Sequence, residues 1–234
     1  MVVAAVSFAG TAASAQNVIS VRPGVEMATE ENRRGVSWSE GRATASADVA
    51  LGIGALEGTA RVGALRDAGL HGGADAVIDL GLAARQQAGP VELTAQGIVH
   101  LFTGAVGKQD YAELGVTAGY TLGPIRATGG AFYAPAQDAI GGSNLYLFAG
   151  ADAGIPATPF TVYGHVGRSS GDVDDPLRAS RLRPGGTYRD WRVGVDHVTG
   201  PLAFSLEYVG TDIPDRDAKG DHDDRLVARA RFSF

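Results

Sequence analysis

The sequence offers few groupings of side chains that could carry out catalysis or hold a metal ion. It contains no cysteine, so neither a disulfide framework nor a thiolate metal site can form. The five histidines are scattered, without a His-Glu-x-x-His pattern or a pair four residues apart, so their spacing predicts no zinc site. Ser37 and Ser39 lack the Gly-x-Ser-x-Gly context of a nucleophile elbow. We therefore expect neither an enzyme nor a cofactor.

Two other patterns could suggest a ligand site, and each has a simpler interpretation. The glycines of segment 52–58 have the wrong spacing for a nucleotide loop and join two predicted strands, which indicates a hairpin turn. The acidic segment 212–224 could offer carboxylates to Ca²⁺. However, Lys219 and Leu226 stand where an EF-hand needs oxygen ligands, so the pattern favours a solvated loop. The same interpretation applies to the acids of segment 172–175.

The stronger signal is an alternation of charged and apolar residues with a period of two. In the last segment, Arg225, Arg229 and Arg231 fall on one face, and Leu226 and Phe232 on the other. A helix would spread these arginines around its circumference, whereas a strand points them all the same way. The alternation recurs upstream and predicts strands near 24–34, 43–52, 56–66, 75–85, 91–101, 111–122, 125–133, 145–155, 160–166, 190–196, 202–208 and 225–234.

The composition favours a membrane barrel over a soluble core or a helical membrane protein. The chain has 34 glycines and only 7% aromatic residues, which leaves few large side chains to fill an interior. The mean hydropathy is zero, as expected for strands whose two faces differ. About twelve strands are expected, and bacterial membrane barrels have even numbers. The net charge of −6 argues against nucleic acid as a partner.

The links between the predicted strands alternate strictly in length. Short turns rich in Gly and Pro stand at 54–55, 87–90, 122–124, 155–159 and 199–201. Longer polar links stand at 31–41, 67–73, 103–110, 134–143, 168–187 and 211–224. This alternation predicts an all-β fold, a single antiparallel transmembrane β-barrel with short periplasmic turns and longer extracellular loops.

In such a barrel the apolar face meets lipid and the charged face lines a wet lumen. An arginine in mid-bilayer would cost about 2–4 kcal/mol, so the three arginines of the last strand must point inward. The residues expected to line the pore are Asp48, Glu57, Arg61, Asp75, Asp79, Arg85, Glu92, Glu113, Arg126, Asp152, Arg192, Asp196, Glu207, Arg225, Arg229 and Arg231. They could create a transverse field across an open constriction, or they could pair across the lumen and plug it. Both outcomes remain open at this point.

The two ends of the chain carry signals for export and assembly. Residues 1–15 read as a signal peptide, with cleavage expected after Ala15, which leaves a barrel at 16–234. No basic residue precedes the apolar stretch, which favours a start codon upstream of Met1. Phe232 and Phe234 close the chain like the C-terminal signal that the barrel-assembly machinery recognises. Phe160, Trp191 and other outward aromatics fit interfacial girdles. We expect an outer-membrane location in a Gram-negative bacterium, in contact with lipid and lipopolysaccharide.

Three segments of the chain resemble the TorF porin family, also known as the Gcw_chp domain of unknown function. Arg34-Gly35-Val36-Ser37 is similar to that family's Arg-Gly-x-Ser segment, and the run 188–195 to its Tyr-x-Asp-Trp strand. The run 224–227 and the terminal phenylalanine also match. Where the family usually has an aromatic residue before the Arg-Gly pair, this chain has Glu31-Asn32-Arg33. The resemblance implies an outer-membrane location and porin activity, and it implies no substrate or catalytic residue.

Three functions compete on this basis. The leading expectation is passive diffusion of small polar solutes through a charged lumen. The alternative is a closed structural barrel whose long loops, 168–187 and 211–224, bind a partner or a surface polysaccharide. The third function is that of a lipid-modifying barrel with a Ser/His site near the outer rim. As a separate alternative for the fold, the chain would be a soluble periplasmic β-protein.

Overall fold

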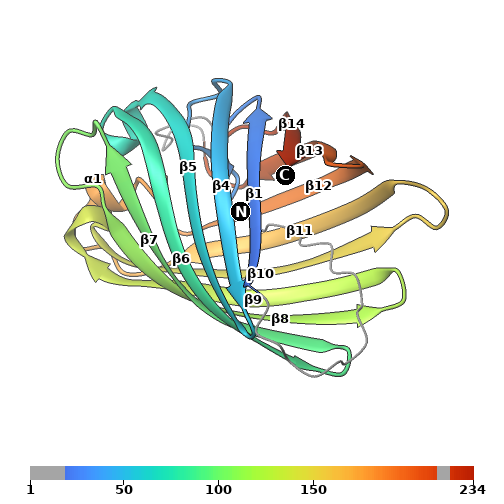
Figure 1. Ribbon diagram of the computed structural model, residues 1–234. Helices are drawn as coiled ribbons and strands as arrows, with labels where there is room; N and C mark the ends of the chain where they lie inside the picture. Colours follow the sequence, from blue (N-terminus) through green and yellow to red (C-terminus); the bar gives the residue numbers. More distant parts are fainter. Residues whose placement is uncertain (1–18, 215–221) are drawn as a thin grey trace.

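Twelve strands of the chain close into one antiparallel barrel (Figure 1). The computed structural model describes residues 19–214 and 222–234, so the expected signal peptide at 1–15 lies outside the described residues. The wall strands are β1 (Ile19–Ala28), β4 (Thr44–Ile53), β5 (Leu56–Ala68), β6 (Ala74–Ala88), β7 (Val91–Thr103), β8 (Tyr111–Leu122), β9 (Ile125–Gln137), β10 (Gly142–Gly154), β11 (Phe160–Ser170), β12 (Tyr188–Thr199), β13 (Leu202–Thr211) and β14 (Arg225–Ser233). Each strand pairs with its neighbours in sequence, and β1 pairs with β14 to close the wall.

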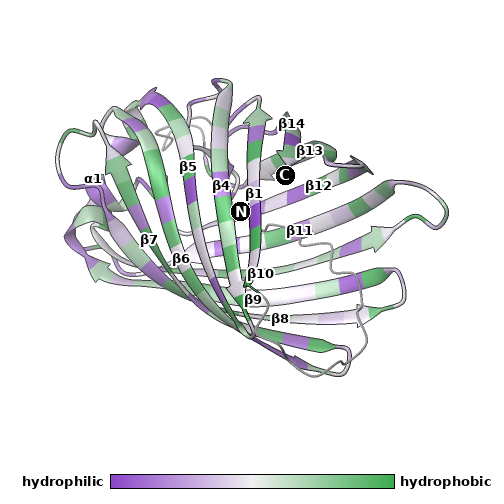
Figure 2. Cartoon of the chain, in the orientation of Figure 1, coloured by the Kyte–Doolittle hydropathy of each residue, from purple (hydrophilic) through white to green (hydrophobic). Residues whose placement is uncertain are grey.

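The two faces of the wall differ as the period of two predicts. Along β14, Leu226 is 65% exposed on the outer face, whereas Val227 is fully buried inside. Figure 2 shows the alternation of apolar and polar bands along the strands. Outward aromatic residues lie near the strand ends, among them Tyr120 and Phe160. The outward face therefore matches the apolar surface that a bilayer requires.

The two rims of the barrel are built differently. One rim, the turn end, carries tight turns, and the turns at Gly123 and Gly200 use φ values of +58° and +57° that favour glycine. The opposite rim, the loop end, carries the long links, and these contain a single turn of α-helix, α1 (Pro176–Ala179), and the 3₁₀ turns η1 (Gly69–His71) and η2 (Asp138–Ile140). The predicted alternation of short and long links is thus confirmed.

None of the helical turns among residues 19–214 and 222–234 is long and apolar enough to cross a membrane.

The first strand differs from its predicted bounds. We expect a strand at 24–34 from the sequence, but β1 runs from Ile19 to Ala28. Glu26, Ala28 and Glu30 occupy every second position, so the period of two continues past the end of the strand at Ala28. The pattern therefore does not show where the chain leaves the wall. It leaves at residue 29 because the acids that follow find partners inside the barrel, as described below.

The main apolar core lies at the loop end, inside the wall. Strand residues and loop residues both contribute to this loop-end cluster, which comprises Val36, Trp38, Leu65, Leu70, Ala74, Val77, Tyr111, Ala134, Ala139, Ile140, Leu182, Tyr188 and Ile213. Burial of such side chains supplies hydrophobic stabilisation. The wall itself supplies little of it, because it is a single sheet whose apolar side chains face outward. The cluster therefore fixes the links in place across the outer mouth of the barrel.

Candidate functional site: a hairpin inside the barrel

The segment between β1 and β4, residues 29–43, folds into the barrel and is here called the inner hairpin. This corrects the expectation that segment 31–41 is an extracellular loop. Its two short strands, β2 (Asn32–Arg33) and β3 (Val36–Ser37), pair with each other and not with the wall. Arg34 and Gly35 join them with φ values of +52° and +79°, as a type I′ turn requires.

Local hydrogen bonds make the inner hairpin a compact unit. The Trp38 backbone N–H donates to the Glu31 carbonyl at 2.6 Å. The Ser39 hydroxyl accepts from the Glu31 N–H at 2.9 Å and donates to the Arg42 carbonyl at 2.7 Å. The Ser37 hydroxyl accepts from the Gly41 N–H at 2.8 Å. Both serines thus hold the backbone of the hairpin.

A charge network ties one side of the inner hairpin to β5 and β6. The Glu31 carboxylate accepts from Arg61 of β5 at 2.6 Å and from Arg33 at 3.0 Å. Arg33 in turn reaches Asp79 of β6 at 2.6 Å. Burial raises the pKa of Glu31, but Arg33 and Arg61 outweigh it and hold that pKa below its ordinary value. Glu31, only 2% exposed, is therefore an ionised group at the centre of the network.

Further pairs anchor the inner hairpin to other parts of the wall. Arg34 donates to both carboxylate oxygens of Glu113 on β8, at 2.9 and 2.8 Å. Arg225 on β14 donates to Glu30 at 2.7 Å. Two histidine contacts complete the network, since His100 on β7 lies 2.7 Å from Asp79 and 3.4 Å from Glu113. The charged anchors come from four strands, β5, β6, β8 and β14, so the hairpin spans the lumen rather than lying along one wall.

Aromatic rings pack against the same arginines. The Arg33 guanidinium lies 4.2 Å from the centre of the Trp38 ring, and that of Arg34 lies 4.5 Å from the ring of Tyr146. Trp38 also packs on His71 with ring centres 4.3 Å apart. Cation–π contacts of this kind are worth about 0.5–2 kcal/mol each. They add to the ion pairs that hold the hairpin.

Segments 34–37, 188–195 and 224–227, noted above for their sequence pattern, meet at the tip of the inner hairpin. Tyr188 of β12 donates its hydroxyl to the Arg34 carbonyl at 3.0 Å. Arg225 donates to the Gly35 carbonyl at 3.2 Å. A Cβ placed on Gly35 would lie 2.9 Å from the Cβ of Asp190, so only glycine lets the tip approach β12 so closely. Segments far apart in the sequence thus together hold the tip of the inner hairpin against β12 and β14.

The link 171–187 covers the outer mouth above the inner hairpin. Arg181 donates to the carbonyls of Ala139 and Gln109, and Arg183 donates to the Ser143 carbonyl at 2.9 Å. Burial, followed by the nearby Arg181 charge, holds the pKa of His71 well below its ordinary value, so His71 is neutral. Together with the loop-end cluster, these contacts tie the link to the neighbouring loops at the loop end.

The turn end of the lumen is different, because many of its charges are paired and partly exposed to water. The pairs there include Arg22–Glu57, Arg229–Glu26 at 3.5 Å, Arg231–Asp48 at 2.5 Å, Arg229–Glu207 at 2.8 Å, Arg192–Glu207 at 3.8 Å, Arg85–Glu57 at 2.6 Å and Arg126–Glu92 at 2.6 Å. A recess of about 150 Å³ opens here, lined by Arg22, Glu57 and Arg85. The side chains of Arg22 and Arg85 are 54% and 37% exposed, which marks a wet vestibule.

The structure places the expected pore-lining residues on the inner face, with one exception. Arg61, Asp79, Glu113 and Arg225 contact the inner hairpin, and the rest line the lumen below it. The exception is Asp75, which is exposed at the loop end. Its strand loses regular pairing with β5 between Ala64 and Ala68, so the period of two no longer fixes the direction of its side chain.

Sequence reasoning missed the hairpin's own charged residues. Glu30, Glu31, Arg33 and Arg34 are central to the network, yet a polar link between two strands gives no sign that it turns inward. The one available signal is Trp38, since a large aromatic residue is unexpected in an exposed link.

A metal site finds no support in the part of the chain that the structure describes. No group of three or more His, Asp or Glu side chains there could hold an ion. Three of the acids of segment 212–224, Asp215, Asp217 and Asp221, lie outside the described residues.

Solved structures with a similar fold are membrane barrels of low sequence identity. A structure from a study of the in-meso crystallisation of membrane proteins aligns with 91% of this chain and 83% of its own, at 11% identity and a TM-score of 0.52. LpxR from Salmonella typhimurium aligns with 91% of this chain and 99% of its own, at 10% identity and a TM-score of 0.53. The outer membrane channel DcaP of Acinetobacter baumannii covers 97% and 100%, at 13% identity and a TM-score of 0.46.

Matches to these structures show the fold alone, and no curated protein matches the sequence. A family model, by contrast, matches residues 11–230, nearly the whole chain. That span includes the inner hairpin, all its anchors on the wall and the segments that meet at its tip. The chain therefore belongs to the Gcw_chp family, bacterial proteins of unknown function.

Proposed function

We propose that this protein is an outer-membrane channel for small polar and charged solutes, whose outer mouth the inner hairpin closes. The observation that carries the proposal is the contrast between the two halves of the lumen. The turn end is a wet vestibule with charges of both signs, such as Arg85 and Glu92. The loop end holds a hairpin that is attached to the wall by ion pairs, hydrogen bonds and the apolar packing of Val36 and Trp38.

The polar attachment of the hairpin supports a movable closure. Water that enters the lumen can replace each of these ion pairs and hydrogen bonds, so the main loss on displacing the hairpin is the burial of Val36 and Trp38. The backbone ladder of the wall does not include the hairpin, because β2 and β3 pair only with each other. The resemblance to the TorF porin family points in the same direction. The chain is proposed to reach the outer membrane of a Gram-negative bacterium after cleavage behind Ala15.

Planar-bilayer conductance tests the proposal. The wild-type barrel is expected to give rare, brief current steps, and the double variant Arg33→Ala/Arg34→Ala longer and more frequent ones, because it removes the contacts to Asp79 and Glu113. Lys108→Ala, at an exposed side chain of the link between β7 and β8, is the control and should behave as wild type. Arg229→Glu should increase cation selectivity, since Arg229 lies between Glu26 and Glu207.

One observation favours a second candidate, a closed barrel that presents its loops to a partner. The loop-end cluster joins the inner hairpin to the links at Leu70, Ile140, Leu182 and Ile213 in one packed unit. If neither the wild-type barrel nor the Arg33/Arg34 variant conducts at any voltage, the channel proposal fails and this candidate replaces it. Loss of partner binding on trimming link 171–187, with the barrel intact, would then support it.

We propose no enzymatic role. The hydroxyls of Ser37 and Ser39 hold the hairpin backbone. Altered lipid A in a strain that overproduces the protein would overturn this proposal.

A further inference from the structure

The outward face of the barrel is almost free of charge. The pairing registers assign the residues of each strand alternately to the outer and inner faces. Among the described residues that pair in these ladders, two outward positions carry Lys, Arg, Asp or Glu, namely Arg168 on β11 and Arg189 on β12. Arg66 and Asp67 lie in the irregular stretch of β5, outside the ladder. Two charges on so large an apolar surface need an explanation.

The two arginines are direct cross-strand partners. Arg168 lies opposite Arg189 in the β11–β12 ladder, an arrangement that places Cβ atoms about 5 Å apart. Like charges opposite one another are destabilising. The side chain of Arg189 is 71% exposed and lies 3.8 Å from a carboxylate oxygen of Asp212, and Arg168 has no ion pair within the described residues. The pair thus keeps a net positive charge that an anion would neutralise.

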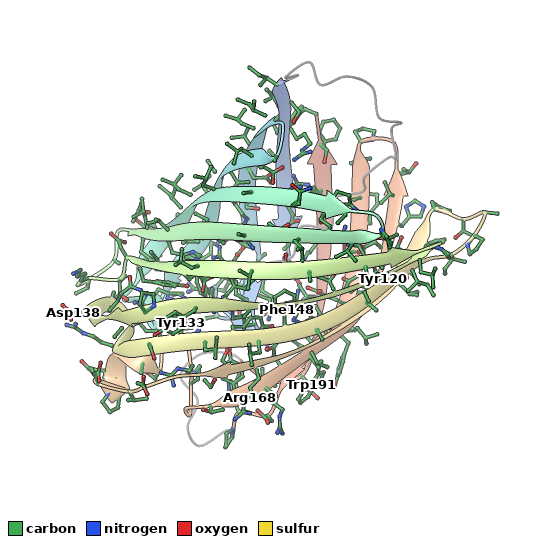
Figure 3. All side chains as sticks on the ribbon, turned by 90° about the horizontal axis from the view of Figure 1, so that it is seen from below. Tyr120, Tyr133, Asp138, Phe148, Arg168 and Trp191 are labelled. Carbon is green, nitrogen blue, oxygen red and sulfur yellow. The ribbon has the colours of Figure 1, made fainter. Side chains whose placement is uncertain are left out.

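The position of the pair matches the level of lipid headgroups. Both arginines lie at the loop-end part of their strands, and the next outward pair toward the turn end is Val166 with Trp191. Figure 3 shows Arg168 and Trp191 on the outer side of the wall. Leu147 of β10 flanks Arg168 on its other side. Tryptophan is enriched where the bilayer meets water, and an arginine at that level is far less costly than one at the bilayer midplane.

We propose that Arg168 and Arg189 bind the phosphate group of a phosphorylated glycolipid in the outer leaflet. Guanidinium groups bind phosphate oxygens in a bidentate manner, and a phosphate between them removes their mutual repulsion. The apolar residues below, Val166, Leu147 and Trp191, face the acyl chains of the same lipid. The site is independent of whether the lumen conducts.

Native mass spectrometry of the detergent-solubilised full chain tests the site with diphosphorylated lipid A as the probe. The wild-type barrel is expected to retain lipid A, and Arg168→Gln/Arg189→Gln to bind at least tenfold more weakly. Arg178→Gln, an exposed arginine outside the pair, should bind as wild type. Because both changed residues are exposed on the wall, heat-modifiable gel migration should show that the variant barrel is folded.

Three comparisons make the outcome decisive. Dephosphorylated lipid A should bind as weakly to the wild type as lipid A binds to the double variant; equal binding of the two lipids would overturn the proposal. Inorganic phosphate at millimolar concentration should not displace lipid A, and displacement would show a site for the free ion instead. Unchanged lipid A binding by the folded double variant would also overturn it.

Discussion

Individual side chains set how firmly the outer mouth is closed. Glu31 is ionised because Arg33 and Arg61 counter the effect of burial on its pKa, and His71 is neutral because burial and Arg181 disfavour its charged form. A carboxyl group with a lowered pKa stabilises the fold above its ordinary value of 4.5 and loses that contribution in acid. A histidine with a lowered pKa acts in the same direction, but from its ordinary value of 6.5 downward.

Acidification should therefore loosen the inner hairpin, beginning near pH 6.5. His71 takes up a proton in the unfolded chain but not in the folded protein. Each pH unit below 6.5 therefore lowers the free energy of unfolding by up to about 1.4 kcal/mol. Trp38 reports the change, because its ring lies 4.3 Å from that of His71 and Trp191→Phe leaves it as the single tryptophan. Acrylamide quenching of Trp38 should rise between pH 7.5 and pH 5. In His71→Gln the rise in Trp38 quenching should start only at the lower pH where Glu31 takes up a proton. A quenching profile that is the same in this variant as in the protein with His71 would contradict this account.

At the scale of elements, the turn of the inner hairpin is its least tolerant point. A Cβ on Gly35 would lie 2.4 Å from Thr211 Cγ2, and its φ of +79° disfavours any other residue. Gly35→Ala should thus destabilise the docked hairpin by about 1–3 kcal/mol. Trp38 quenching at neutral pH should increase as the tip is pushed from β12.

A matched control for this change exists on the wall. A Cβ on Gly58 of β5 would meet nothing within 4 Å, so Gly58→Ala should leave Trp38 quenching as in the wild type. If both alanine variants behave alike, the close approach of the tip to β12 and β13 is not what holds the hairpin.

For the molecule as a whole, the end of β14 is expected to direct assembly. Phe232 and Phe234 are outward-facing, with ring centres 4.9 Å apart, and the Phe234 N–H donates to the Pro23 carbonyl at 3.2 Å. Phe234→Ala should lower the amount of barrel in outer-membrane fractions severalfold, because the assembly machinery is proposed to recognise this end. Refolding in detergent should be nearly unchanged, since the side chain packs against little else. Equal losses in cells and in detergent would indicate a purely structural role.

The wall could be predicted from the sequence because its determinants are local. A bilayer on one side and water on the other impose the period of two, and Gly-Pro turns such as Gly123-Pro124 mark the reversals. The inner hairpin could not, because its contacts are remote in sequence: Arg225 lies 195 residues from Glu30, its partner. Alternation also says which residues face inward without saying what they meet there. Arg61 and Asp79 were expected to face the lumen, with a solute or a charge of opposite sign as their partner, and they bind a piece of their own chain.

The contact between Glu30 and Arg225 has one more consequence, for the seam where the barrel closes. β1 and β14 share the shortest ladder of the wall, five residue pairs from Gly24 to Ala28. The inner hairpin continues directly from β1 and contacts β14 through the Glu30–Arg225 ion pair. It therefore connects the two strands beside this shortest ladder. Withdrawing the hairpin would remove the Glu30–Arg225 ion pair and leave that seam with its backbone hydrogen bonds and the Arg229–Glu26 ion pair. Displacement of the inner hairpin and separation of β1 from β14 are then coupled. A molecule that stabilises the pairing of β1 with β14 would therefore also stabilise the docked hairpin.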